Sequence, residues 1–181
     1  MLFKKSVMTA AVFAVGSFAV MSANAADSGE FGVTMTLTAT CSVDTSAISL
    51  AFADQSAATT TNTTLATSTG DIAVICSKDA PYKISLASSN VTNTSGIGQM
   101  IHAEGVGVDS QNTISYQLYS NLEGTTPWGS DATVGTGNIV GGTGAGLTAG
   151  ARTHKVYAKM SSPTDILLGE YSDTVTASIT Y

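Results

Sequence analysis

Apolar and polar residues alternate strictly near the start of the chain, over residues 31–41. Every even position is glycine or threonine, and the odd positions are Phe31, Val33, Met35, Leu37, Ala39 and Cys41. A period of two over this length is typical of a β-strand with one buried face. Two interpretations follow. The stretch is the first strand of an ordinary sandwich, or it is a strand that becomes buried in the core of another molecule.

The same period recurs in shorter stretches along the rest of the chain. Residues that favour turns separate these stretches, which is typical of short strands. The apolar positions that define the predicted strands are Ile48, Leu50 and Phe52; Tyr82, Ile84 and Leu86, entered through Pro81; Ile114, Tyr116 and Leu118; Val156, Ala158 and Met160; Val175, Ala177, Ile179 and Tyr181; and Ile72, Val74 and Cys76. Because Ala73 and Ile75 are apolar as well, we expect the strand with Ile72, Val74 and Cys76 to be buried on both faces.

The segments between the strands are rich in small and polar residues. Residues 54–70 predict a surface loop or a weak edge strand, residues 90–98 predict turns, and the seven glycines of residues 135–150 predict a flexible loop or hairpin. No stretch predicts a helix. Six or seven short strands indicate an all-β fold, an antiparallel sandwich of the immunoglobulin-like kind. The chain stops in mid-strand at Tyr181, which favours a sandwich that lacks its last strand and lends out its first.

The first 25 residues have the features of a secretory signal. Lys4 and Lys5 precede a short apolar run over residues 7–20, and Ala23-Asn24-Ala25 forms an A-x-A cleavage site. The apolar run is shorter than the ~20 residues that a membrane span needs. We therefore expect an exported chain that starts at Ala26 and forms one domain without membrane insertion.

Charge and cysteine content narrow the class of protein. Without Lys4 and Lys5 the chain has five basic and 13 acidic residues, and therefore a formal net charge of −8. This negative charge argues against binding to nucleic acid or to an anionic membrane. In an exported chain the only two cysteines, Cys41 and Cys76, most simply form one disulfide. A metal pair or a reactive thiol is the alternative, although no second cysteine pair or nearby histidine completes a metal site.

Candidate chemistry is sparse. The two histidines, His102 and His154, have no G-x-S-x-G motif to support an active site, so we expect them to pack on strands or at the surface. The glycines at 142–146 lack the ending of a phosphate loop, and the aspartates lack calcium-loop spacing. Trp128 is either an exposed binding aromatic or a loop anchor. We predict no catalytic, cofactor or metal site and no enzyme activity.

The two ends of the mature chain resemble the spore coat U family, whose members include the major pilin of archaic (Csu-type) chaperone–usher pili. The resemblance rests on the alternating segment before Cys41, on Cys76 in the next core strand, and on Gly-Glu-Tyr-Ser-Asp-Thr at 169–174 followed by alternation to Tyr181. It implies a division into a signal peptide at 1–25, an N-terminal donor-strand segment at 26–40 and a pilin β-sandwich at 41–181.

The resemblance also implies a function. Such subunits build surface pili that support adhesion and biofilm formation. A periplasmic chaperone binds each subunit and delivers it to an outer-membrane usher. There the groove of the sandwich takes the N-terminal strand of the next subunit. The residues implied here are the donor positions Phe31, Val33, Met35, Leu37 and Ala39, and the groove-edge strand Tyr171, Val175, Ala177, Ile179 and Tyr181. Two rivals remain: a secreted coat or matrix protein without an usher, and a sugar-binding module that uses Trp128 and the glycine-rich loop.

Overall fold

We analysed a computed structural model of the chain, which describes residues 28–46, 48–57, 65–104, 113–133, 136–162 and 164–181. The predicted signal at 1–25 lies outside these residues. Residues 1–36 and 37–181 are two separate compact units, and the strands all belong to the second. Within the described residues no helix is long and apolar enough to span a membrane.

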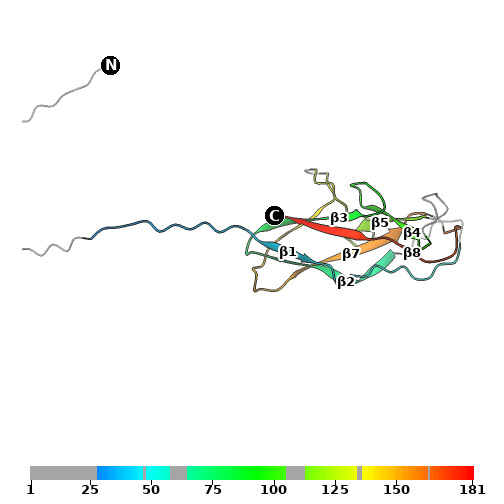
Figure 1. The fold of residues 1–181 in the computed structure, drawn as a ribbon, viewed down its shortest axis with the longest axis horizontal. Helices are drawn as coiled ribbons and strands as arrows, with labels where there is room; N and C mark the ends of the chain where they lie inside the picture. The colour runs from blue at the N-terminus through cyan, green and yellow to red at the C-terminus, as the bar shows by residue number, and fades with distance from the viewer. Residues whose placement is uncertain (1–27, 47, 58–64, 105–112, 134–135, 163) are drawn as a thin grey trace, which may run out of the picture. The chain divides into compact units, whose positions relative to one another are not determined.

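The second unit consists of two antiparallel sheets (Figure 1). Six strands make the larger sheet, in the order β1 (Cys41–Asp44), β2 (Leu65–Cys76), β7 (Arg152–Met160), β5 (Thr113–Tyr119), β4 (Ile97–His102) and β8 (Tyr171–Ser172). The smaller sheet has the order β6 (Val140–Thr143), β3 (Pro81–Ser88) and β9 (Val175–Thr180). The predicted all-β antiparallel sandwich is confirmed.

The core lies between the sheets and follows the two-residue period. On β3, for example, Tyr82, Ile84 and Leu86 are buried while Lys83 is exposed, because successive side chains of a strand point to opposite faces. The buried cluster also includes Ile72, Val74, Cys76, Tyr116, Leu118, Val156 and Ala158. The predicted strands around Tyr82, Tyr116, Val156 and Val175 are therefore confirmed, although β9 ends at Thr180, one residue before Tyr181.

Trp128 belongs to this core. Its side chain is completely buried, and its indole Nε1 donates a hydrogen bond to the backbone oxygen of Ile84 at 3.0 Å. The interpretation of Trp128 as an exposed binding aromatic was wrong. A large aromatic ring with one satisfied polar atom fills a sandwich core well, and the sequence around it gives no sign of that depth.

Several strand boundaries differ from the sequence prediction. Residues 48–53 form no strand, and β4 was not predicted. The strand β2 extends back to Leu65, because it pairs with β7. Over residues 71–76 it is fully buried on one face only: Ile75 is 36% exposed, and the described residues form no further sheet on that side.

Part of the glycine-rich stretch is a strand. β6 pairs with β3 and places Gly142 against the ring of Tyr82 and Gly144 against the backbone of Ser77. A Cβ atom at either position would collide with these neighbours. Close packing, which only glycine permits, therefore explains these two residues better than flexibility does.

Candidate binding groove

One edge of the smaller sheet is unpaired in the described part of the chain. β9 pairs with β3 through a continuous register from Lys83 opposite Thr180 to Ser88 opposite Val175. It is the last strand of its sheet, so its other edge has no strand neighbour. Free backbone donors and acceptors along such an edge form a template for an additional strand.

A hollow of about 320 Å³ runs beside this edge. Its apolar lining comes from both sheets and from the segment after β1. The residues that reach it include Ile48, Leu50, Phe52, Met100, Val175 and Ala177. The edge and the hollow together, which we call the groove, offer backbone hydrogen bonds and an apolar floor, the two things that an inserted strand needs.

The segment 48–53 forms one wall of the groove. Ile48, Leu50 and Phe52 are partly buried against the core, and the residues between them are exposed. The alternation that the sequence predicted is therefore present, whereas the strand is absent. Because no neighbouring strand pairs with this segment in the described residues, its backbone forms no ladder.

Asp173 lines the groove and is the centre of a hydrogen-bond network. Its carboxylate accepts hydrogen bonds from the hydroxyls of Ser88 at 2.5 Å, Ser89 at 3.1 Å and Tyr116 at 2.7 Å, and from the backbone N–H of Thr174 at 2.7 Å. Burial, followed by the contact with Asp173, raises the pKa of Tyr116, so this phenol stays protonated and donates. The network holds the chain where it crosses from one sheet to the other.

Because the chain crosses between the sheets here, the prediction of one groove-edge strand from Tyr171 to Tyr181 was wrong. Tyr171 and Val175 do not share a strand: Tyr171 lies on β8, which pairs with β4 in the larger sheet, whereas Val175 begins β9 in the smaller one. The carboxylate of Asp173 binds groups from both sheets and so ends the first strand and starts the second. Both residues nevertheless line the groove, as does Ala177. Ile179 lies farther along β9, and Tyr181 follows the strand as an exposed residue.

The alternating N-terminal segment is not a strand of this sandwich. Residues 28–40 have no regular secondary structure. The side chains of Phe31, Val33, Met35 and Leu37 are 79–87% exposed. Of the strand predicted over residues 31–41, only Cys41 lies in a strand, where β1 begins. Four large apolar side chains at every second position, all exposed to solvent, are unusual for a finished surface.

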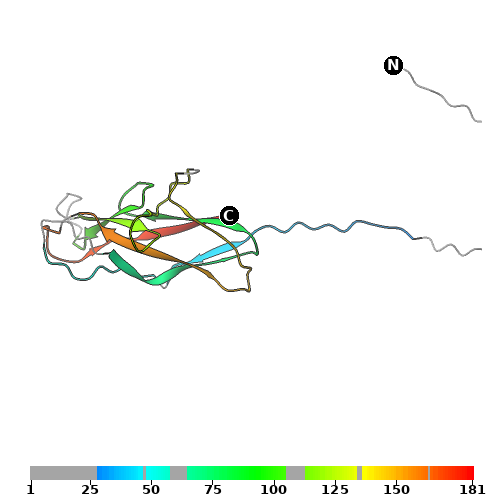
Figure 2. The ribbon, with the colours of Figure 1, turned by 180° about the vertical axis from the view of Figure 1, so that it is seen from behind.

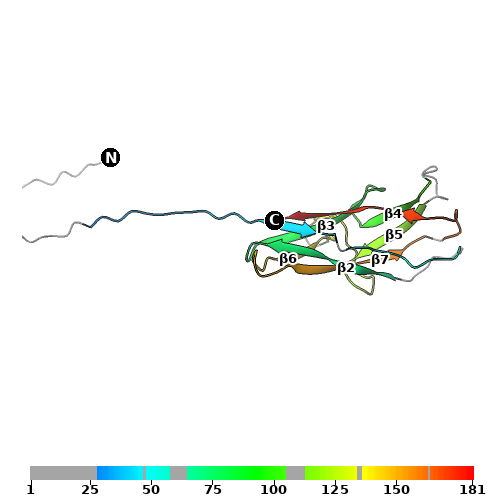
Figure 3. The same cartoon turned by 60° about the horizontal axis from the view of Figure 1, so that its bottom comes forward.

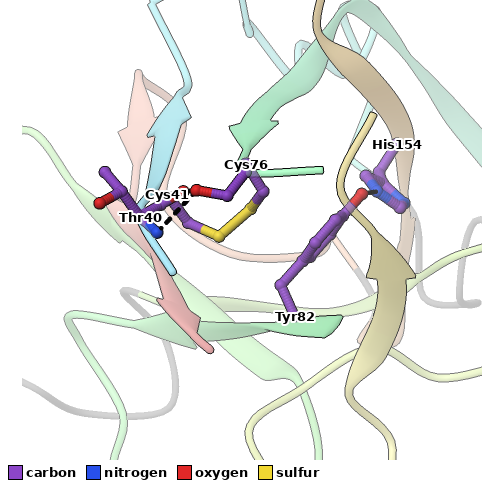
Figure 4. Close-up of a disulfide and its surroundings, with 6 residues drawn as sticks. Thr40, Cys41, Cys76, Tyr82 and His154 are labelled. Carbon is purple, nitrogen blue, oxygen red and sulfur yellow. Dashed lines mark hydrogen bonds between the residues drawn. A yellow bond between two sulfur atoms is a disulfide. The ribbon is translucent and has the colours of Figure 1, made fainter. Parts of the chain in front are cut away.

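The predicted disulfide between Cys41 and Cys76 is confirmed, and it joins β1 to β2 where these residues pair (Figure 4). Beside it, the backbone N–H of Thr40 donates to Oγ of Ser77 at 3.0 Å, and the oxygen of Thr40 accepts from the backbone N–H of Ser77 at 2.9 Å. The chain is thus fixed to the sandwich from Thr40 onward.

Replacing Cys41 and Cys76 together by serine is expected to reduce the free energy of unfolding by about 3–4 kcal/mol. The disulfide closes a loop in the unfolded chain and so limits the conformational entropy that the chain gains when it unfolds. Urea unfolding of the wild-type and double-variant proteins measures the difference. Ser42→Ala, on the exposed face of β1, is the matched control and should leave the midpoint unchanged. An unchanged midpoint in the double variant would show that the bond contributes nothing to stability.

The two histidines have packing contacts. Nε2 of His154 forms a 2.8 Å hydrogen bond with the hydroxyl of Tyr82 (Figure 4), and partial burial lowers the pKa of this histidine. His102 stacks edge-on against Tyr171, and its Nε2 lies 3.2 Å from the backbone oxygen of Leu168. Both residues join neighbouring strands and segments, as the sequence predicted. Among the residues that the structure describes, no group of three or more His, Cys, Asp and Glu side chains is placed to hold a metal ion.

Sequence reasoning assigned to the groove only residues of the last strand and missed the rest of its lining, including Met100 on β4 and Asp173. Met100 lies in Ile-Gly-Gln-Met-Ile-His, where a glycine and a glutamine interrupt the alternation. Asp173 stands beside Ser172 and Thr174 just before the last alternating run. Such a Ser-Asp-Thr corner is a recognisable signal for side-chain to backbone hydrogen bonds at a strand start.

Comparisons with known proteins gave the following results. The family model described as the Spore Coat Protein U domain matches residues 27–178. No curated protein matches the chain. A solved structure, the crystal structure of the CsuC–CsuE chaperone–tip adhesion subunit pre-assembly complex from archaic chaperone–usher Csu pili of Acinetobacter baumannii, is similar with 18% identity and a TM-score of 0.46. The similarity covers 81% of this chain and 40% of that one, so the present chain spans less than half of its length.

Proposed function

The chain belongs to the Spore Coat Protein U domain family, and from this premise we propose that it is a structural subunit of a surface pilus assembled by donor-strand exchange. In this proposal the groove of each subunit takes the N-terminal segment of the next one. The fibre supports adhesion and biofilm formation, and the subunit has no catalytic role. The partners are identical or related subunits, a periplasmic chaperone and an outer-membrane usher.

One observation carries the proposal: the same chain has an open apolar groove along β9 and an exposed segment with the pattern of a strand. The backbone of an inserted segment would complete the ladder of β9. Its odd residues, Phe31 to Ala39, would enter the groove. Burying an apolar side chain of this size contributes roughly 1.5–3 kcal/mol, so the four largest together would stabilise the joint by roughly 6–12 kcal/mol.

The geometry of such a joint leads to a fibre. Segment and groove are different surfaces of one chain, so the contact is head-to-tail and propagates instead of closing. Before assembly the groove edge is an aggregation hazard. A chaperone that lends a strand to β9 would cover this edge, and Val175, Ala177 and Ile179 are the residues of β9 that would face it.

The division of the chain follows from the same proposal. Residues 1–25 direct export and are removed, residues 26–40 are the donor segment, and residues 41–181 form the pilin sandwich. The subunit passes through the periplasm and ends in an extracellular pilus. The disulfide between Cys41 and Cys76 fits this route, because such bonds form in the oxidising periplasm.

Electron microscopy of cells with and without the gene tests the proposal. Surface fibres are expected only when the gene is present, and they should be absent from cells whose subunit lacks residues 27–37. Normal fibres after that deletion would contradict donor-strand assembly. The interpretation as a secreted coat protein that needs no usher would then be favoured. A sugar-binding module that uses Trp128 has lost its basis, because this side chain is buried.

A further inference from the structure

The sandwich has two ends with different surfaces. At one end, which we call the disulfide end, the pairing registers bring together Cys41, Cys76, Thr143, Arg152 and Thr180. At the other, which we call the leucine end, residues 166–170 lie next to Met160 and to Tyr171, the neighbour of His102. Figures 1 and 2 show β1 and the C-terminus at the same end, and the connection between β7 and β8 at the opposite one.

The groove continues to the leucine end. A second hollow, of about 520 Å³, shares Leu50, Phe52, Met100, Tyr171 and Ser172 with the first one and is also lined by Leu167 and Leu168. The two hollows therefore adjoin each other, and we call them together the channel, which extends from Ala177 to the leucine end. In Figure 3 the strand β9, in red, and β4 lie along the same side of the sandwich. A strand in the groove can leave it at this end.

The folded body of a donor subunit would follow its strand at once. Ala39 is the last apolar donor position, and Thr40 is already held by Ser77 next to the disulfide of Cys41. One residue spans at most about 3.6 Å. The disulfide end of a donor subunit must therefore lie against whichever end of the acceptor its strand leaves.

From these constraints, and resting on the proposed function, we propose that successive subunits also bind end to end, with the leucine end of the acceptor against the disulfide end of the donor. The opposite orientation would place the donor body at the acceptor's own disulfide end. That is where the acceptor's own N-terminal segment joins its sandwich at Thr40. Because that segment has to reach the next subunit, the two chains would compete for the same space.

Apolar side chains at both ends fit such a contact. Leu168 at the leucine end is 83% exposed and Leu167 is 50% exposed. At the disulfide end Leu147 is 58% exposed, in a turn that is tied to Cys76 by the hydrogen bond from the N–H of Gly146 to the oxygen of Cys76. Contact between these surfaces would remove three exposed leucines from water.

The charges of the two ends are complementary. Of the five basic residues after residue 25, three exposed ones lie at the disulfide end, Lys78, Lys83 and Arg152, with one acid, Asp79. The leucine end carries exposed carboxylates next to the channel, with Lys159 the cation nearest to it. These acids are Asp54, Glu104, Asp165 and Glu170. Opposite charges on facing surfaces guide association and fix the orientation of the partners.

Purified fibres of the full chain test the end contact. Leu168→Asp and Leu147→Asp should each release subunits about tenfold faster when fibres are warmed in detergent, since interface changes act mainly on dissociation. Lys78→Glu should have the same direction of effect. Leu122→Asp is the matched control: Leu122 is 51% exposed in the loop after β5, which ends where Tyr119 pairs with Tyr157 in the interior of β7, and its fibres should dissociate like wild type.

A synthetic peptide of residues 27–40 separates this inference from the proposed function, because it fills the groove without bringing a second body. The peptide should bind the Leu168→Asp subunit as tightly as wild type, which also shows that the variant is folded. Suppose that the peptide binds and fibres form, but Leu168→Asp and Leu122→Asp fibres dissociate at the same rate. The end contact is then wrong, whereas donor-strand assembly is still supported. If the peptide does not bind the wild-type groove, the proposed function and the end contact both fail.

Discussion

Replacing Val33 or Leu37 by aspartate is expected to abolish fibre formation, because each change would put an unpaired charge into an apolar groove. Leaving a charge buried without a partner costs several kcal/mol, a large part of the burial energy that four apolar side chains supply. The subunit itself should fold normally, since both side chains are more than 80% exposed in the single chain and contribute nothing to its core.

Thr34→Asp and Thr36→Asp are the matched controls for this prediction. They place the same charge on the same segment, but even positions point away from the groove when odd positions point into it. The measurement is the ladder of polymers on unboiled gels, together with recovery of each subunit with its chaperone. Ladders of equal strength for odd and even substitutions would refute the register in which the odd face inserts.

Deleting residues 178–181 is expected to eliminate chaperone binding and to cause degradation of the subunit. The deletion removes half of β9, including the residues opposite Lys83, Ile84 and Ser85. Ile84 is completely buried, and loss of its strand neighbour opens the core beside it. The shortened edge would also leave a chaperone strand with few backbone partners.

Tyr181→Ser is the control for the truncation. It removes an exposed aromatic ring that lies outside β9, and it retains the length of the chain. Subunit yield in the periplasm and co-purification with the chaperone measure both changes. If the truncated subunit still co-purified in normal yield, β9 would not be the edge that the chaperone covers, whereas a loss confined to the truncation supports the assignment.

Local patterns in the sequence predicted a large part of this fold. The two-residue period identified the strands around Tyr82, Tyr116, Val156 and Val175, because alternation in a half-buried strand is visible wherever the two faces meet different surroundings. The single cysteine pair identified the disulfide, since an exported chain with two cysteines has one simple pairing. These features depend on composition and spacing within a short stretch.

The pattern of residues 31–41 shows where local information ends. Its period correctly marks an apolar face, but the period is the same for a strand of this sandwich and for a strand destined for another molecule. The assembled sheets add that the described sandwich forms without a strand from this segment and that β9 is an edge strand in it. The stretch with Ile48, Leu50 and Phe52 also has the predicted alternation, but in the part of the chain that the structure describes it is not a strand of either sheet.

The sequence by itself therefore determined the fold class, most strands, the disulfide and the apolar positions of residues 31–41. The tertiary structure alone decided the depth of Trp128, the network of Asp173 that carries the chain from one sheet to the other, the course of the groove and the surfaces at its two ends. Each of these depends on residues far apart in the chain, and strand pairing sets their proximity. A period describes which side of a strand is apolar, whereas the neighbour that covers that side is a property of the whole arrangement.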